Sequence, residues 1–233
     1  MALKEILTKN NISDEKCSLF EKYYEMLIDW NEKINLTAIT EEDEVAKKHF
    51  LDSLNANVSG IIEDGFSVID VGTGAGFPGI PLKIDNPSIK LTLLDSLAKR
   101  VNFLNEVTSS LGLKDVTALH ARAEDMGVDK KYREKFDICV SRAVANLATL
   151  SELCLPFVKK GGYFVSLKGP KAPEEVEEAK KAIKLLGGEF IKIENYDVSD
   201  TDLNHNIVLI KKVSQTPTKY PRKAPKPSKE PLV

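Results

Sequence analysis

The stretch with the most evident chemistry is a glycine-rich loop that follows an apolar run, VIDVGTGAGFPGIPL at residues 68–82. Its four glycines are Gly72, Gly74, Gly76 and Gly79, and the last three match GxGxxG, a pattern found in dinucleotide sites that is weak by itself. Bare backbone lets a ligand approach closely, and Pro78 stands where it can begin a helix whose N-terminal amides bind an anion. The loop therefore predicts a ligand site without specifying the ligand.

An acidic residue at the end of the preceding strand bears on the charge of that ligand. Asp70 lies two residues before Gly72, where a buried carboxylate would disfavour a pyrophosphate but would suit a ligand with a cationic end. S-adenosylmethionine has such an end, because its ammonium and sulfonium groups are positive, and its carboxylate can accept the helix amides. The residues alone leave three alternatives open: a methyltransferase, an NAD-dependent oxidoreductase with the same loop, and an adenosine-binding module associated with RNA that has no turnover.

Polar residues also follow the later predicted strands. Asp95 ends the second strand, where an acid can accept hydrogen bonds from the two ribose hydroxyls of an adenosine. Ala123 and Glu124 follow the third strand, beside the expected place of the adenine. Because ligands bind at the carboxyl ends of parallel strands, we expect these residues to converge with Asp70 and Arg142.

The elements that must position these residues alternate between strand and helix. The predicted strands are 66–72, 90–95, 116–121, 136–142, 162–169, 189–198 and 204–213, and the predicted helices among them are 97–111, 147–158 and 173–186. This alternation indicates an α/β fold with a doubly wound, parallel sheet. The last two strands have no helix between them, so one of them must run antiparallel, which fits a methyltransferase better than a dehydrogenase.

Three segments are expected along the chain. Residues 1–60 form an N-terminal helical cap, with apolar residues at helical spacing over 2–30, a helix N-cap at Ser13 and a further helix from about Glu41. Residues 61–213 form the sheet domain. Residues 214–233 form a basic tail whose many prolines predict an extended or mobile segment that does not pack into the core.

Composition limits the class of protein. The 233 residues carry a net charge of -2 and suffice for one sizeable α/β domain with an appendage. No membrane span or export signal is visible, so we expect a cytoplasmic protein without a membrane partner. The three cysteines have no CxxC spacing, and neither a disulfide framework nor a metal site is predicted.

Charge is distributed unevenly. Residues 211–233 contain seven Lys or Arg and one acid, Glu230, which gives +6 and leaves -8 for residues 1–210. Such a body would repel a polyanion except at the tail and at local basic patches. Either the tail binds a polyanion or it only solubilises the chain.

Taken together, the motifs resemble the RsmG (GidB) family of bacterial 16S ribosomal RNA guanine-N7 methyltransferases. The resemblance rests on VIDVGTGAGFPGIPL, LLDSLAKRVNFL (93–104), ARAED (121–125), DICVSRAVANL (137–147) and LKG (167–169), and also on WNEKINLTAI, HFLDSL (49–54) and YPRKAPKPSKEPL. It runs from about residue 20 to the C-terminus, and Ala224 stands where the family usually has a glycine. It implies a Rossmann-like fold with a mostly parallel seven-stranded sheet and an antiparallel final strand. It also implies an S-adenosylmethionine site built from Gly72, Phe77, Ala123, Glu124 and Arg142.

The implied reaction needs no catalytic acid or base. Guanine N7 has an exposed lone pair and no proton, so the protein has only to align N7 with the methyl carbon, which can be worth ~7 to 11 kcal/mol. We therefore predict no catalytic residue, and we interpret His49, His120 and His205 as a cap residue, a strand-end residue and a turn residue. The partner would be 16S ribosomal RNA or the small ribosomal subunit, bound by a monomer.

Basic residues at predicted strand ends and helix starts are candidates for contacts with this RNA. The RNA contacts that we predict are Arg142, Lys168, Lys99, Arg100, Arg222 and Lys223, with Lys47, Lys48 and Arg122 as further basic positions. Local basic patches on an acidic body indicate one defined RNA site rather than general coating of nucleic acid.

Overall fold

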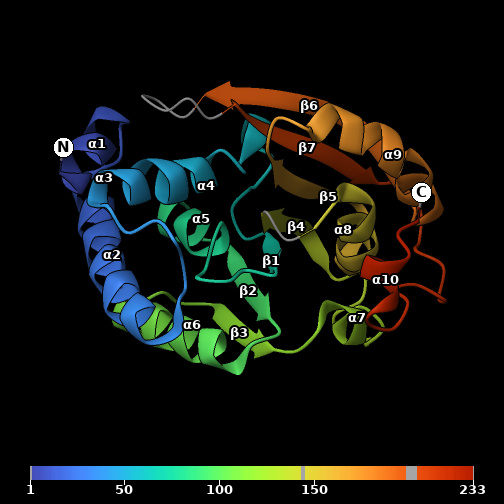
Figure 1. Cartoon of the computed structure of the whole chain (residues 1–233), viewed down its shortest axis with the longest axis horizontal. Helices are drawn as coiled ribbons and strands as arrows, with labels where there is room; N and C mark the ends of the chain where they lie inside the picture. The colour runs from blue at the N-terminus through green and yellow to red at the C-terminus, as the bar shows by residue number, and fades with distance from the viewer. Residues whose placement is uncertain (1, 143–144, 198–203, 233) are drawn as a thin grey trace.

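A computed structural model describes residues 2–142, 145–197 and 204–232. Its centre is one seven-stranded sheet in the order β3-β2-β1-β4-β5-β7-β6 (Figure 1). The strands are β1 Ser67–Val71, β2 Lys90–Asp95, β3 Val116–His120, β4 Phe136–Arg142, β5 Val158–Lys168, β6 Gly188–Asp197 and β7 Asn204–Lys212. Strands β1 to β5 are parallel, and β7 pairs antiparallel with both β5 and β6. The predicted parallel sheet with an antiparallel final strand is confirmed.

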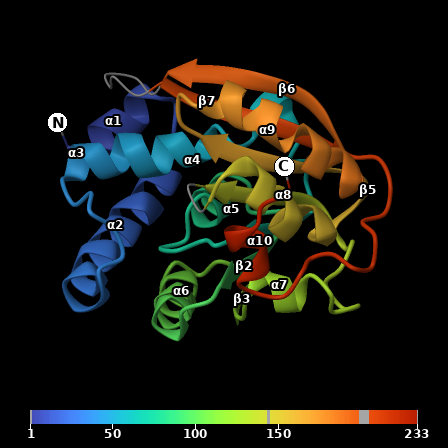
Figure 2. The ribbon, with the colours of Figure 1, turned by 45° about the vertical axis from the view of Figure 1, so that its right-hand side comes forward.

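Helices cover both faces of this sheet (Figures 1 and 2). They are α1 Leu3–Lys9, α2 Asp14–Ile34, α3 Glu42–Val45, the π-helix η1 Ala46–Leu51, α4 Asp52–Leu54, the 3-10 turn η2 Val58–Gly60, α5 Gly79–Asp85, α6 Ala98–Ser110, α7 Ala123–Met126, α8 Leu147–Cys154, the 3-10 turn η3 Leu155–Phe157, α9 Ala172–Leu185 and α10 Lys226–Lys229. The side chain of Ser13 accepts the amide of Lys16 at 3.5 Å, which confirms the predicted N-cap of α2. Pro78 directly precedes α5, as expected.

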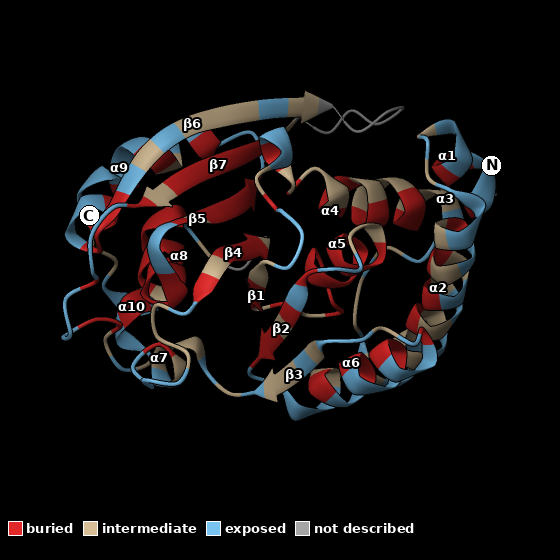
Figure 3. Cartoon of the chain, turned by 180° about the vertical axis from the view of Figure 1, so that it is seen from behind, coloured by how far each residue is buried: buried red, intermediate tan, exposed pale blue. Residues whose placement is uncertain are grey.

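Side chains alternate between the two faces because successive residues of a strand point in opposite directions. On β7, Ile207 and Leu209 join the cluster that includes the cap helices, whereas Val208 and Ile210 join the cluster of α8 and α9. The central strands are accordingly buried from both sides (Figure 3). The segment expected as a helical cap, residues 1–60, thus shares one continuous core with the sheet.

The C-terminal segment does not fit the expectation of an extended tail free of the core. Tyr220, Pro221 and Pro227 are buried, and the segment ends in α10, which packs beside α8 (Figure 2). Proline-rich composition predicts little structure by itself, but here the body supplies buried polar partners that hold the segment. The prediction of an extended or mobile tail is therefore wrong.

Candidate functional site

A first cavity of about 380 Å³ lies at the carboxyl ends of β1 to β4. It is lined by Val71, Gly72, Leu94, Asp95, Ser96, Arg100, Ala121, Arg122, Ala123, Glu124, Arg142 and Leu153. Five of the six predicted cofactor residues are among these, and the exception is Phe77. Gly72 has φ +72°, a conformation that favours glycine, and so it presents bare backbone to the cavity.

Asp95 ties the glycine loop to the start of α6. Its Oδ2 accepts the amide of Gly74 at 2.9 Å, its Oδ1 accepts the amide of Leu97 at 2.9 Å, and the Arg100 guanidinium lies 3.5 Å from Oδ2. The side chain is only 3% exposed. A carboxylate oxygen can accept more than one donor, so the ribose contact predicted for Asp95 stays a prediction.

Asp70 holds the same loop from beneath and does not line the cavity, contrary to the predicted convergence. Its Oδ2 accepts the hydroxyl of Thr73 at 2.7 Å and the amide of Gly79 at 2.8 Å, and the residue is fully buried. Burial raises the pKa of Asp70 to about 7. The carboxyl group is turned under the loop, where the loop's own donors occupy its Oδ2.

Phe77 packs beneath the loop against the helical cap. Its ring stacks on His49 with centroids 4.6 Å apart and lies 5.4 Å from the ring of Tyr23. The Arg142 guanidinium carbon lies 5.0 Å from the Phe77 centroid, a cation–π distance. The cofactor contact implied for Phe77 stays a prediction, and in this structure the ring supports Arg142.

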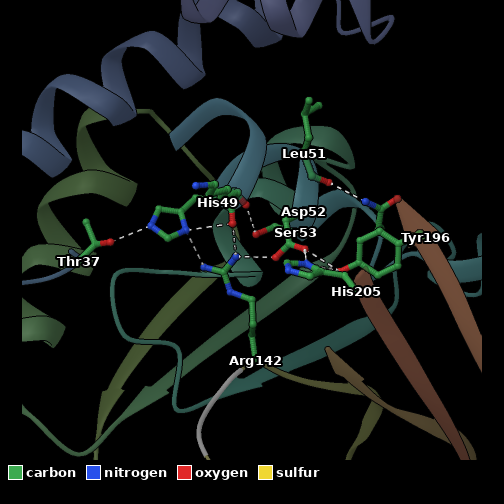
Figure 4. Close-up of polar contacts among 10 residues, drawn as sticks. Thr37, His49, Leu51, Asp52, Ser53, Arg142, Tyr196 and His205 are labelled. Atoms are coloured by element: carbon green, nitrogen blue, oxygen red, sulfur yellow. Dashed lines mark hydrogen bonds and ion pairs between the residues drawn. The ribbon is translucent and has the colours of Figure 1, made fainter. Parts of the chain in front are cut away.

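Arg142 leaves the end of β4 and binds the cap (Figure 4). Its Nη1 donates to the Asp52 carboxylate at 2.8 Å and to the carbonyl of Lys48 at 3.1 Å, and its Nη2 lies 3.2 Å from Nδ1 of His49. The side chain is 16% exposed. The residue lines both the first cavity and a second one on the other side.

The acceptor for this arginine, Asp52, is buried at the centre of a network that joins the cap to β6 and β7 (Figure 4). Besides Arg142, it accepts the hydroxyl of Tyr196 at 2.6 Å and lies 2.5 Å from Nδ1 of His205. Burial alone would raise the pKa of Asp52, but the hydrogen bond from His205 and the charge of Arg142 outweigh burial and lower it. Asp52 is therefore ionised at neutral pH.

His205 lies within β7 and not in a turn, so that part of its interpretation is wrong. The role of Asp52 was missed altogether, although an acid among the apolar residues of HFLDSL is a signal that could have revealed it. His49 is a cap residue, as interpreted, and His120 is exposed at the end of β3.

His49 is neutral at physiological pH. Burial and then the neighbouring charge of Arg142 lower the pKa of His49 to about 4. Nδ1 lies 3.2 Å both from Nη2 of Arg142, which can only donate, and from the carbonyl oxygen of Lys48, which can only accept, and Nε2 lies 2.8 Å from the hydroxyl of Thr37. Both ring nitrogens therefore have polar partners.

The second cavity, of about 750 Å³, adjoins Arg142 between the cap and the ends of β5 and β7. It is lined by Ile39, Lys48, His49, Asp52, Arg142, Ala145, Leu167, Lys168, Gly169, Glu175 and His205. The Lys168 ammonium donates to the carbonyl of Ala145 at 2.5 Å and to the Glu175 carboxylate at 2.7 Å. Among the described residues these contacts use two of its three N–H donors.

The other predicted RNA contacts lie at the rim or on the tail. Lys99 is exposed in the first turn of α6, and Arg100 beside it lines the first cavity. Arg222 faces inward, where its guanidinium makes a bidentate ion pair with the fully buried Glu152, whereas Lys223 is exposed. Four tail lysines are exposed, and we refer to them as the tail lysines: Lys219, Lys223, Lys226 and Lys229. None of these RNA contacts is tested by the structure.

Comparison with known proteins decides the family. The family model described as rRNA small subunit methyltransferase G matches residues 16–204, which is most of the chain. The chain belongs to this family. A relative of that description from Alkaliphilus oremlandii (strain OhILAs) is 54% identical over 238 residues, covering 100% of both chains, and one from Clostridium novyi (strain NT) is 52% identical, covering 95% of this chain and 91% of its own.

Solved structures share the fold at low sequence identity. The M. jannaschii TYW2 structure in complex with AdoMet has a TM-score of 0.53 at 16% identity, covering 70% of this chain and 75% of that one. A geranyl diphosphate methyltransferase in complex with SAM has a TM-score of 0.56 at 12% identity, covering 74% and 88%. The predicted Rossmann-like methyltransferase fold is confirmed.

Membership of the family confirms the predicted enzyme class. The chain is an S-adenosylmethionine-dependent methyltransferase whose substrate is small-subunit, 16S, ribosomal RNA. Within the described residues, no helix is both long enough and apolar enough to cross a membrane.

Proposed function

We propose that the first cavity holds S-adenosylmethionine, that the second receives a guanine of 16S ribosomal RNA, and that the methyl group passes to guanine N7. The observation that carries this proposal is Arg142, which lines both cavities and so places them side by side. A reaction between two bound partners needs such adjacency, because alignment is the main contribution available to the protein.

The residues of the first cavity fit the cofactor. The bare backbone at Gly72 admits a close approach, and the backbone after β3 brings Ala123 and Glu124 to the same opening. When bound, S-adenosylmethionine supplies an activated methyl group on a sulfonium. The chain itself contributes binding groups at the carboxyl ends of four strands, where ligands of such sheets bind.

The residues of the second cavity fit an electron-rich base attached to phosphates. Lys48, Lys168 and Arg142 bring N–H donors to its lining, where Asp52 and Glu175 pair with Arg142 and Lys168, and Ile39 and Leu167 bring apolar surface for a ring. Guanine presents O6 and N7 as acceptors, which pair with basic donors. We propose that Lys168 and Arg142 contact the RNA here, with Lys99, Arg100 and Lys223 as more remote contacts. The guanidinium of Arg222, also predicted as an RNA contact, is instead paired with Glu152.

The state of His49 also supports an acceptor atom without a proton. The pKa of this histidine is lowered to about 4, and both ring nitrogens are engaged, with Arg142 and Thr37. A general base works best with a pKa near the operating pH, so His49 is poorly suited to remove a proton at pH 7. Transfer to guanine N7 requires no such removal.

Methyl transfer from radiolabelled S-adenosylmethionine tests the proposal on naked 16S RNA and on assembled small subunits. We expect one labelled guanine, at which the backbone becomes sensitive to aniline after borohydride reduction, as N7-methylated guanine does. A labelled guanine that resists this cleavage would place the methyl on another atom. Calorimetric titration with S-adenosylmethionine and with NAD distinguishes a methyltransferase from an NAD-dependent oxidoreductase. A protein that binds S-adenosylmethionine without transferring label would be the adenosine-binding module.

The role of the second cavity is tested with Lys168→Met. Lys180→Met is the matched control, because Lys180 is an exposed lysine of α9, paired with Glu177. We expect Lys168→Met to raise KM for RNA while the Kd for S-adenosylmethionine stays at the parent value, and the control to change neither. Equal KM values for RNA in the two variants would remove Lys168 from the RNA site.

We also propose that the enzyme acts as a cytoplasmic monomer. Sedimentation equilibrium at assay concentration checks the oligomeric state, and cell fractionation checks the location.

A further inference from the structure

Part of the cofactor cavity is built by an element that cannot hold its own position. Helix α7 is a single turn, Ala123–Met126, with no buried residue, yet Ala123 and Glu124 line the cavity. One isolated helical turn is unstable in water because its nucleation costs more than its hydrogen bonds return. The position of α7 must therefore be set by contacts from outside it.

One of these contacts comes from an arginine that binds α7 and the C-terminal segment together. Arg133 Nη1 donates to the carbonyl of Gly127, directly after α7, and to the carbonyl of Tyr220, both at 2.8 Å. Its Nη2 donates to the carbonyl of Thr216 at 2.6 Å. The guanidinium thus uses a fixed fork of donors to hold the end of α7 against the segment that follows β7.

Close packing joins the same two segments. A Cβ placed on Gly127 would lie 2.9 Å from Cγ of Pro221, closer than real side chains allow. The backbone of Gly127 is helical and would itself allow a side chain, so the obstacles at residue 127 are Pro221 and, at 3.0 Å, the carbonyl oxygen of Ala123. The C-terminal segment is therefore in direct contact with the backbone after α7.

The segment is anchored a second time on α8, which also lines the cavity. The carboxylate of Glu152, which is fully buried, accepts Nε of Arg222 at 2.9 Å, Nη2 at 2.6 Å and the Arg222 backbone amide at 2.7 Å. The next residue of α8, Leu153, lines the cofactor cavity. Arg222 is the only ion-pair partner of Glu152 among the described residues, so the buried carboxylate depends on it.

We propose that residues 216–222 position α7 and α8 at the cofactor cavity, with Arg133 and Arg222 as positioning residues for S-adenosylmethionine binding. This rests on the assignment of the first cavity to the cofactor. If the tail were mobile, changes in it would leave the affinity for the cofactor unaltered. Under this proposal, changes in residues 216–222 weaken cofactor binding. When the segment is detached, α7 becomes ordered only when the cofactor binds. The loss of conformational entropy on ordering α7 then lowers the affinity for the cofactor.

The experiment compares Arg222→Met with Lys223→Met, which changes the exposed neighbour in the same segment. Binding of S-adenosylmethionine is measured by calorimetry on the full chain, well below the melting temperature of each variant, and hydrogen exchange is followed at the amides of residues 123–127. We expect Arg222→Met to raise the Kd about tenfold or more and to speed exchange at α7. Lys223→Met should leave the Kd and the exchange rates unchanged.

The proposal would be overturned by a folded Arg222→Met variant whose Kd for S-adenosylmethionine and whose hydrogen-exchange rates at α7 equal those of the parent. If Arg222 only stabilised the fold, its loss would lower the melting temperature and change neither quantity. If Arg222→Met does not fold, Gly127→Ala takes its place, because its added methyl meets Pro221 while the helical backbone accepts alanine. Parent affinity in Gly127→Ala would then be the contrary result. If the parent protein does not bind S-adenosylmethionine, the assignment of the cavity has failed and not the positioning role.

Discussion

Removal of the buried imidazole at His49 should change how the stability of the protein depends on pH. The unfolded chain takes up a proton at this side chain below about pH 6.5, whereas in the folded protein burial and Arg142 lower the pKa to about 4. Between these values the unfolded state binds more protons, so stability falls as the pH falls. The contribution of His49 is complete above pH 6.5 and lost progressively towards pH 4.

The size of the effect follows from the same two values. Proton linkage with pKa values of 6.5 and about 4 gives a loss of roughly 1.8 kcal/mol between pH 7 and pH 5. We expect His49→Gln to lack this component, since a glutamine side chain can donate and accept hydrogen bonds at this place without titrating. Other groups titrate in both proteins, so the difference between parent and variant isolates the histidine.

Urea unfolding at pH 7 and pH 5, followed by circular dichroism, measures the effect. The matched control is His120→Gln, which removes an exposed imidazole, and we expect it to keep the parent's pH dependence. If His49→Gln loses as much stability between pH 7 and pH 5 as the parent does, the buried, neutral state derived for His49 is refuted.

Three further changes test the site and the tail. Gly72→Asp should abolish binding of S-adenosylmethionine while leaving the fold largely intact, because it places a side chain and a negative charge where the cavity has bare backbone; calorimetry that finds parent affinity would contradict this. Asp52→Ala should lower the free energy of unfolding by roughly 3–5 kcal/mol, because Arg142, which is only 16% exposed, loses the carboxylate that pairs with it; urea titration showing less than about 1 kcal/mol would argue that the network is dispensable. Changing the tail lysines to alanine should flatten the dependence of log affinity for RNA on log salt by roughly 0.7 to 0.9 for each phosphate that is no longer bound, without altering cofactor affinity, and an unchanged slope would show that they only solubilise the chain.

The features that could be predicted from the sequence are those set by local pattern. Alternating apolar strands and amphipathic helices determine the sheet, and parallel strands bring their carboxyl ends together, which is why the expectation of Gly72, Asp95 and Glu124 at one opening is correct. Side-chain direction is a finer property. Asp70 is turned beneath the loop by donors from Thr73 and Gly79, and no spacing rule predicts that choice.

The features that could not be predicted depend on partners far apart in the chain. Asp52 meets Tyr196 and His205 only after the whole sheet has been assembled, so nothing near residue 52 reveals these partners. Likewise, the proline-rich tail packs because a buried Glu152 requires a cation, and the sequence around Arg222 carries no sign of that carboxylate. The composition of the tail predicts its behaviour as an isolated peptide, whereas contact with Glu152 determines its conformation in the folded protein.

The bond between Asp52 and His205 also bears on how the protein is made. The two residues are separated by 153 positions, and chains are synthesised at roughly 5 to 20 residues per second. The helices of the cap therefore leave the ribosome roughly 8 to 30 seconds before the strand that completes their core. During that interval the cap has an acid and an apolar face without partners, so a nascent chain that stalls before residue 205 should be a target for chaperones and proteases. We expect the cap to become resistant to proteolysis only when β7 has emerged from the ribosome.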